Sequence, residues 1–186
     1  MGWYEQSATQ TFELLQQIPE WEKSTVFLPG AGTSILIDEL AEKGARLVLN
    51  DISSEALARA RKKMGDKADQ NVWLCQNIAQ PVLGLESEID IWIDRAVLHF
   101  LTDESDIEGY FNNLNSLLKP GGHAIFAQFS EKGAKKCAGL KLHRYSLQEL
   151  TERLGRTFTL VSSFNYTHTM PNGNPRPYVY ALYKKN

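Results

Sequence analysis

The chain has 186 residues and a mass of 21.0 kDa, with 42% hydrophobic and 23% charged residues, as expected of one globular domain with a sizeable core. Its formal net charge of −2 gives no electrostatic reason to expect a nucleic-acid partner. No apolar stretch is long enough for a membrane span, and residues 1–10 have no signal-peptide pattern. Cys75 and Cys137 fit neither a zinc spacing nor a disulfide framework. We therefore expect a cytoplasmic protein, with residues 1–186 forming a single domain and no metal.

The first half of the chain alternates between helical and strand patterns. Pro19 stops the first helical pattern, Ser53 can cap a later helix, and Gly65 ends that helix. Residues 1–20 are expected to hold an N-terminal helix and a possible lid. The helices predicted in this half cover residues 7–18, 33–43 and 53–64. The strands predicted in this half cover residues 26–28, 46–50 and 71–75.

In the second half the order changes, because two strand patterns follow each other at the end. Lys-Pro-Gly-Gly at residues 119–122 breaks a helix and introduces a strand, and Ser146 opens a capping box. Residues 170–177 are rich in Pro, Asn and Gly, which predicts a hairpin between the last two strands. The helices predicted in this half cover residues 102–118 and 146–154. The strands predicted in this half cover residues 89–93, 123–129, 158–166 and 178–183.

This order of elements predicts an α/β fold. Alternating strands and helices favour a parallel sheet with helices on both faces, and the hairpin adds an antiparallel strand. The expected structure is therefore a Rossmann-like sheet of seven strands, mostly parallel. Ligands of such sheets bind at the carboxyl ends of the strands, near the switch in strand order.

A Gly-Ala-Gly turn follows the first predicted strand, and Asp51 follows the second, 19 positions after Gly32. Small residues let the backbone approach a ligand, and an acid at the second strand end can accept from ribose hydroxyls. This layout predicts a site for an adenosine-bearing ligand. A nicotinamide-dependent oxidoreductase is disfavoured, because the dinucleotide fingerprint needs a third glycine where Ile35 stands.

These motifs together resemble the class I S-adenosylmethionine (SAM)-dependent methyltransferases, over nearly the whole chain. Within that family, residues 90–103, 136–146 and 168–173 look like a compact bacterial group of small methyltransferases. The parts that carry the family resemblance are the turn at residues 30–32, Asp51, Asn77 with Ile78, Asp94, the turn at residues 119–122 and the late hairpin.

The resemblance implies a set of SAM contacts. The glycine turn would approach the methionine and ribose portion, Asp51 would accept from the ribose, and residues after the third and fourth strands would contact adenine and methionine. The cofactor-binding residues implied in this way are Gly30, Ala31, Gly32, Asp51, Ile52, Asn77, Ile78, Asp94, Arg95 and Ala96.

One position departs from the family pattern. Such proteins usually carry an acid two residues before the first glycine, which helps to hold the amino-acid end of SAM, whereas this chain has Leu28 followed by Pro29. Proline also lacks an N–H and fixes φ. Asp94 is the nearest motif acid that could substitute, and we expect it and His99 to serve as catalytic residues.

The acceptor site is expected among aromatic, basic and thiol side chains that follow strand ends. Arg144 could hold an anionic substrate, and His99 or His168 could take a proton. Trp3 and Tyr4 could fold back as a lid. The candidate substrate-binding residues are Trp3, Tyr4, His99, Phe129, Cys137, Arg144, Tyr145 and His168, with Tyr166 beside them.

The resulting hypothesis is a SAM-dependent methyltransferase that acts on a small-molecule acceptor, such as a thiol or carboxylate, as a monomer or homodimer. Protein-lysine methylation and a non-catalytic SAM-binding protein are the alternatives. Nucleobase methylation is disfavoured, because residues 94–97 read Asp-Arg-Ala-Val rather than the Pro-aromatic tetrapeptide that stacks a flipped base.

Overall fold

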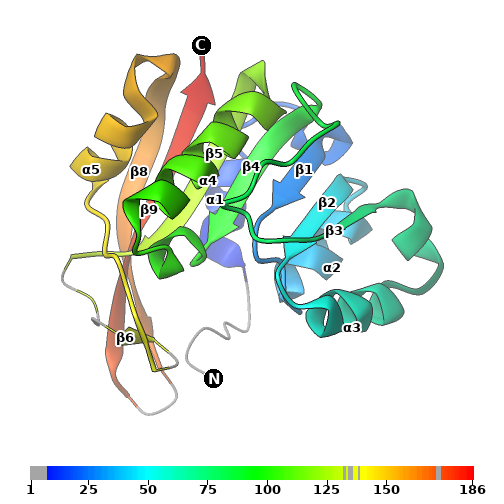
Figure 1. The fold of residues 1–186 in the computed structure, drawn as a ribbon, viewed down its shortest axis with the longest axis horizontal. Helices are drawn as coiled ribbons and strands as arrows, with labels where there is room; N and C mark the ends of the chain where they lie inside the picture. The colour runs from blue at the N-terminus through cyan, green and yellow to red at the C-terminus, as the bar shows by residue number, and fades with distance from the viewer. Residues whose placement is uncertain (1–7, 132, 134–135, 138, 171–172) are drawn as a thin grey trace.

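The fold is built on a seven-stranded sheet with the strand order β3-β2-β1-β4-β5-β9-β8 (Figure 1). It is seen in a computed structural model that describes residues 8–131, 133, 136–137, 139–170 and 173–186. The strands of this sheet are β1 (Thr25–Leu28), β2 (Arg46–Asp51), β3 (Val72–Cys75), β4 (Ile89–Arg95), β5 (Leu118–Phe129), β8 (Phe158–Thr169) and β9 (Pro175–Lys185). The α-helices are α1 (Thr9–Leu15), α2 (Ile35–Glu42), α3 (Ser54–Met64), α4 (Glu104–Leu117) and α5 (Leu147–Leu154).

The pairing of the strands confirms the predicted architecture. β1 pairs in parallel with β2 and β4, β2 with β3, and β4 with β5. β9 alone runs against its neighbours, since it pairs antiparallel with both β5 and β8. The sheet is therefore mostly parallel, with one antiparallel strand supplied by the C-terminal hairpin.

Helices cover both faces of the sheet, which leaves one apolar core on each side (Figure 1). Residues of α1, α2 and α3 join one core, and residues of α4 and α5 join the other. Successive residues of β4 point to opposite faces, so Ile91 and Ile93 belong to the first core and Trp92 to the second. This alternation decides which β4 side chains can reach a ligand.

Serine side chains cap the N-termini of three of the helices. Ser53 Oγ accepts from the Ala56 N–H at 3.2 Å, and Ser146 Oγ accepts from the Glu149 N–H at 3.0 Å, as their positions predict. Ser34 does the same for α2, accepting from the Leu36 N–H at 3.3 Å. These caps satisfy backbone donors that have no partner within the helix.

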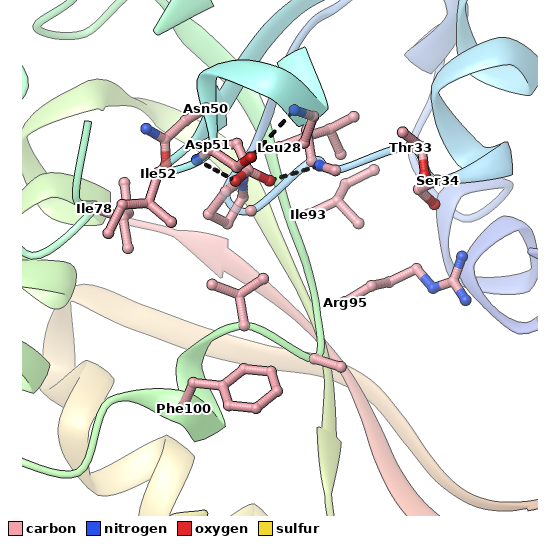
Figure 2. A pocket seen from close by; sticks show the side chains of 18 of the residues that line it. Leu28, Thr33, Ser34, Asn50, Asp51, Ile52, Ile78, Ile93, Arg95 and Phe100 are labelled. Atoms are coloured by element: carbon pink, nitrogen blue, oxygen red, sulfur yellow. Dashed lines mark hydrogen bonds between the residues drawn. The ribbon is translucent and has the colours of Figure 1, made fainter. Parts of the chain in front are cut away.

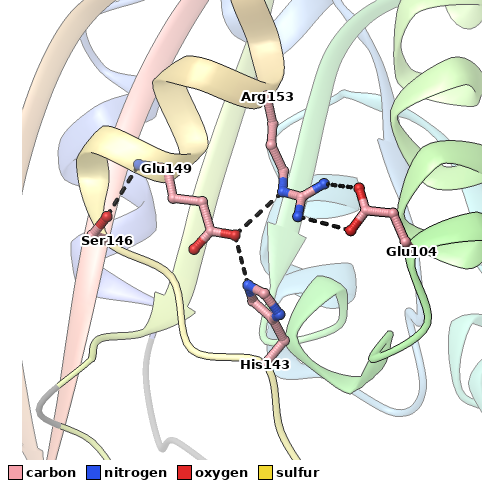
Figure 3. A network of polar contacts seen from close by, with 5 residues as sticks. All are labelled: Glu104, His143, Ser146, Glu149 and Arg153. Carbon is pink, nitrogen blue, oxygen red and sulfur yellow. Dashed lines mark hydrogen bonds and ion pairs between the residues drawn. The ribbon is translucent and has the colours of Figure 1, made fainter.

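An ion-pair network holds α5 against the start of α4 (Figure 3). Arg153 binds both carboxylate oxygens of Glu104, at 2.6 and 3.1 Å, and contacts Glu149 at 3.3 Å. Glu149 also lies 2.6 Å from His143 Nε2. The side chain of Glu149 is thus shared between the loop before α5 and the arginine, and Ser146 supplies the cap.

Several elements differ from the prediction. β5 begins at Leu118, because the residues 119–122 predicted as a turn run on within the strand beside a pairing irregularity opposite Ile89 and Ile91. The two hairpin strands are longer than predicted, and Figure 1 shows the hairpin extending past the rest of the sheet. A two-stranded sheet of β6 (Lys136–Cys137) and β7 (Leu140–Lys141) was not predicted. Within the described part of the chain, no helix is long and apolar enough to cross a membrane.

Candidate functional site

A cavity of about 730 Å³ lies at the carboxyl ends of β1, β2 and β4. This is the position at which ligands of doubly wound sheets bind, and the volume is in the usual range for small-molecule sites. Its walls include the glycine turn after β1, the end of β2, the loop after β3 and the end of β4 (Figure 2).

The glycine turn after β1 forms one wall of the cavity. Gly30 and Gly32 have φ values of 52° and 55°, in the left-handed region that favours glycine. A Cβ on Gly30 would also lie 2.4 Å from Val97 Cγ2, so Gly30 packs too closely on the loop after β4 to carry a side chain unless Val97 shifts. The Ala31 N–H donates to the Asn50 carbonyl at 2.8 Å, which ties the turn to β2.

Asp51 ends β2 and lines the cavity beside this turn. One carboxylate oxygen accepts from the Gly32 N–H and the other from the Ser53 N–H, both at 2.8 Å (Figure 2). Asp51 is half-buried and lines the cavity, and each of its carboxylate oxygens has a further lone pair. Two backbone donors therefore orient an acceptor that can bind hydroxyl groups of a ligand.

Two isoleucines lie on one side of the cavity (Figure 2). Ile52 follows Asp51 and is 75% exposed, whereas Ile78, in the loop after β3, is 5% exposed. Together, the exposed Ile52 and the buried Ile78 provide apolar surface for a flat ring on this side of the cavity. Asn77 also lines the cavity, and its Oδ1 accepts from the Ala79 N–H at 2.9 Å.

Asn113 of α4 fixes the loop that carries Ile78. Its Nδ2 donates to the carbonyls of Ile78, at 2.6 Å, and Gln80, at 2.8 Å, and its Oδ1 accepts from the Val82 N–H at 3.0 Å. The side chain is buried, so these three bonds satisfy polar groups that water cannot reach. Sequence patterns gave no signal for this contact, because it joins residues about 30 positions apart.

The end of β4 forms the floor of the cavity through Ile93, Arg95 and Ala96. Ala96 has φ 65°, an unusual value for a residue with a side chain, and its N–H donates to the Ala127 carbonyl at 2.9 Å. Such backbone strain persists only where surrounding contacts enforce it.

Asp94 supplies those contacts, and it does so from behind the floor. Its oxygens accept from the backbone N–H groups of Val97, at 2.8 Å, and Leu98, at 3.0 Å. They also accept from Gln128 Nε2 at 2.8 Å and from the Tyr110 hydroxyl at 2.6 Å. Burial raises the pKa of Asp94, and the four donors oppose that shift.

The expectation that Asp94 lines the cavity and replaces the missing acid at Leu28 therefore differs from the structure. Strand alternation turns Ile93 and Arg95 toward the cavity and Asp94 away from it. Asp94 is fully buried, and protein donors already occupy both of its oxygens. Its role in this structure is to shape the backbone of the floor.

His99 is also buried and does not line the cavity. Its ring stacks on Phe129 at 4.5 Å, and its Nδ1 lies 3.2 Å from Gln128 Oε1. Since Gln128 donates to Asp94 through its amide nitrogen, its oxygen accepts, and Nδ1 of His99 carries the proton. Burial lowers the pKa of His99 to about 3, and Nε2 has no hydrogen-bond partner among the described residues. The ring is thus neutral, and the structure places it behind the cavity wall, not in contact with an acceptor.

The other candidate substrate residues are spread around this end of the sheet. Phe129 and Tyr145 are fully buried, and Tyr145 Oη has no hydrogen-bond partner in the part of the chain that the structure describes. Arg144 donates to the backbone carbonyls of Glu131 and Gly133, and His168 and Tyr166 are half-buried on β8. None of these five side chains is among the described residues that line the cavity. Cys137 belongs to β6 and its side chain is not described, while Trp3 and Tyr4 lie outside the described residues.

The side chains that line the cavity without having been predicted to do so include Phe100, Leu140, Tyr178 and Tyr180. Phe100 follows β4, Leu140 belongs to β7, and the two tyrosines share one face of β9. Phe164 of β8 stacks on Tyr180 at 5.1 Å with an interplanar angle of 3°. The alternation of Tyr178 and Tyr180 is visible in the sequence, but their position beside the cavity depends on the strand order.

In the described residues, no group of His, Cys, Asp and Glu side chains could hold a metal ion.

Comparisons with known proteins agree with this geometry. Among solved structures, the chain is similar to the N-methyltransferase NodS from Bradyrhizobium japonicum in complex with S-adenosylhomocysteine (SAH), with a TM-score of 0.76 and 18% identity over 95% of this chain and 84% of that one. It is also similar to the Burkholderia thailandensis 1,6-didemethyltoxoflavin-N1-methyltransferase with bound 1,6-didemethyltoxoflavin and SAH, with a TM-score of 0.75 and 20% identity over 96% and 77% of the two chains. At these identities the likeness concerns the fold.

Comparison of the amino-acid sequence with known proteins gives matches over part of the chain. Nodulation protein S of Sinorhizobium fredii is 26% identical over 107 residues, which are 58% of this chain and 48% of that protein. The chain spans about half the length of the curated relatives that it matches first. The family model described as "Methyltransferase domain" matches residues 29–124, just over half of the chain, from the glycine turn to the middle of β5. The chain therefore belongs to the class I SAM-dependent methyltransferase family.

Proposed function

We propose that this protein binds SAM and transfers its methyl group to a small, partly apolar acceptor. The observation that carries the proposal is the Asp51 carboxylate, which two backbone N–H groups orient at the wall of the cavity. Family membership and the bound SAH in two similar structures support the same ligand.

The residues of the cavity fit an adenosyl group. Ile52 and Ile78 offer apolar surface to the adenine, Asp51 can accept from the ribose hydroxyls, and the glycine turn leaves room for the chain beyond the ribose. Asn77 adds a polar group beside the adenine position. These are the contacts that the sequence motifs imply.

The chemistry that SAM supplies when bound is an electrophilic methyl group on a sulfonium whose sulfur leaves neutral. The residues of this chain then have to align the acceptor and exclude water, and such positioning can lower a barrier by about 7 kcal/mol or more. Because His99 lies behind the wall, no histidine lines the described cavity. An acceptor that loses its proton easily, such as a thiol or a carboxylic acid, or a neutral amine with a free lone pair, suits this site.

The acceptor end of the cavity is apolar and aromatic, since Phe100, Leu140, Tyr178 and Tyr180 line it. The acids among the described lining residues are Asp51, which ends β2, and Glu55, which follows it. A lysine side chain would therefore meet no carboxylate near Phe100 and Tyr180. This supports a small molecule over the protein-lysine alternative.

Thermal-shift titration with SAM, SAH and NAD tests the cofactor. We expect SAM and SAH to raise the melting temperature, and Asp51→Asn to weaken SAH binding at least about 10-fold because a charge-assisted acceptor is lost. Glu108→Gln, which changes an exposed acid of α4, is the matched control and should bind normally. Stabilisation by NAD alone would contradict the proposal.

An SAH-release assay with thiols, carboxylates, amines and lysine peptides then tests the reaction. Turnover with one small-molecule class supports the proposed activity. Turnover with peptides alone would favour protein-lysine methylation. Tight SAM binding without turnover on any class would favour a non-catalytic SAM-binding protein.

A further inference from the structure

The cavity continues along the sheet past the strand ends at which the adenosyl group is proposed to bind. Its lining residues come from β2, β1 and β4, and then from Ala127 of β5 and from Tyr178 and Tyr180 of β9. These five strands are consecutive in the sheet, and neighbouring strands lie about 4.8 Å apart, so β9 is on the order of 19 Å from β2. With adenine and ribose at the end of β2, the part of the cavity at β5 and β9 is left for the acceptor.

Aromatic rings line this far part of the cavity, and further rings pack directly behind them. Phe100 and Tyr178 line the cavity, while His99 and Phe129 are fully buried. The centroid of the Phe100 ring lies 4.5 Å from that of His99, and His99 stacks on Phe129 at the same distance. Phe129 in turn lies 4.8 Å from Tyr178. Figure 2 shows Phe100 at the opposite end of the view from Asp51. These four side chains thus form an aromatic row whose two end members reach the cavity.

Backbone contacts fix both ends of this aromatic row. Phe129 and Tyr178 are directly paired residues of β5 and β9. The other two rings belong to the short helix η3 (Leu98–Phe100), where the His143 N–H donates to the His99 carbonyl at 2.9 Å. In a close-packed row one ring cannot shift without moving the next, so the two end rings have fixed positions at the cavity. A surface that is preformed in this way costs less free energy to order when a ligand binds.

The surroundings of the two end rings are apolar. Leu101 lines the cavity next to Phe100, and Leu140 of β7 lines it with a side chain that is 59% exposed. An exposed leucine in a cavity wall has apolar surface that a bound ligand can cover. The charged side chains among the described lining residues belong to β2, α3 or β4, and none of them comes from β5, β7 or β9. The acceptor part of the cavity therefore favours an uncharged, apolar body.

We propose that the acceptor is a flat aromatic compound whose ring packs against Phe100 and Tyr178, while Leu140 covers part of it. Aromatic rings favour offset-stacked or edge-to-face contacts with one another, and such contacts stabilise a complex beyond the effect of the buried area. The inference rests on the proposed function, because it takes SAM to occupy the cavity at β2. It adds the class of acceptor, which that function leaves open.

Pairs of ligands that differ only in their ring test this proposal. Benzyl mercaptan, phenylacetate and benzylamine are each compared with the cyclohexylmethyl compound that carries the same nucleophilic group. The methylene between ring and nucleophile keeps the reactivity within each pair similar. Calorimetry on the SAH-loaded protein measures Kd, and SAH release in the presence of SAM measures kcat/KM. We expect at least one pair to bind, with Kd about 10-fold lower and kcat/KM about 10-fold higher for the aromatic member.

Three variants separate the effect of the rings from that of apolar surface. Phe100→Leu keeps an apolar side chain but removes the ring, so the preference for the aromatic member should fall to about 2-fold or less. Its SAH affinity should stay unchanged, which also shows that the variant is folded. Leu140→Ala should weaken both members of a pair by a similar factor and preserve their ratio. Phe12→Leu is the matched control, because Phe12 of α1 packs on Trp21 and is not among the lining residues.

Three results would overturn the inference: tighter or equal binding of the cyclohexylmethyl members, an unchanged preference in Phe100→Leu, or no binding of any of these compounds to the SAH-loaded protein. In each case, SAH binding together with turnover of another small acceptor leaves the proposed function intact. If SAH does not bind the wild type, the proposed function and this inference both fail.

Discussion

His99 couples the stability of the folded protein to pH, because its imidazole is buried in the neutral form. The unfolded chain has a histidine pKa near about 6.5, whereas burial, aided by the positive charge of Arg176, lowers the folded pKa to about 3. Between these values the unfolded state binds more protons. The contribution of His99 to stability is therefore complete above about pH 6.5 and is lost as the pH falls toward about 3.

We expect this proton linkage to lower the free energy of unfolding by about 2 kcal/mol between about pH 7.5 and pH 5. Urea titrations at the two pH values measure it. His99→Asn can still donate toward Gln128 but cannot titrate, so it should lose most of that pH dependence. His123→Gln is the control. Burial also lowers the pKa of His123, but this residue is only half-buried, so the variant should keep most of the pH dependence. An equal pH dependence in wild type and His99→Asn would contradict the interpretation.

The sequence predicts some of the residues that line the cavity and misplaces others. The glycine turn, Asp51, Ile78 and Arg95 line the cavity as their motifs imply, because each motif is local and follows a strand end. Asp94 was expected to line it too, yet the period-2 alternation of β4 directs it to the other face. Applying that alternation from Ile91 and Ile93 onward would have separated Arg95 from Asp94.

Helix α4 supports, through Asn113, the side of the cavity that we propose for adenine. We expect Asn113→Leu to lower the free energy of unfolding by about 3 kcal/mol, because it leaves buried groups of Ile78, Gln80 and Val82 without partners. SAH affinity should fall as well, since Ile78 loses its support. Asn112→Leu changes the exposed neighbour on the same helix and should have little effect on either quantity. A loss of stability with unchanged SAH affinity would mean that Ile78 does not depend on this contact.

Among the elements, the long periodic ones were predictable and the irregular ones were not. Ser53 and Gly65 mark the ends of α3 by local chemistry alone. β5 includes residues 119–122, where its register with β4 shifts, and Lys119 pairs there with Asp90 of β4 at 2.7 Å, a contact that no turn rule contains. The hairpin strands extend beyond Tyr166, where apolar alternation stops but the two strands still pair, as far as Thr169 with Pro175.

At the scale of the whole molecule, the cavity joins β1, β2, β4 and β9, which belong to the same sheet and bury side chains in both cores. A ligand that binds only the folded state should therefore stabilise the entire domain. At about 100 times its Kd, SAH should add about 2.7 kcal/mol to the free energy of unfolding. Hydrogen exchange should show equal slowing for the most protected amides of β1 and β5, although β5 lies farther from the glycine turn. Slowing confined to the glycine turn would show that the site unfolds separately.

Pro29 has a consequence for the way in which the cavity meets its ligand. Its ring restricts the backbone just before Gly30 already in the unfolded chain, so this conformational freedom is lost neither on folding nor when a ligand arrives. The bond from Ala31 to Asn50 and the bonds of Asp51 hold the same wall in place. The site is thus preorganised: the wall is in its final shape before binding, and the entropy lost on association comes mainly from the ligand itself.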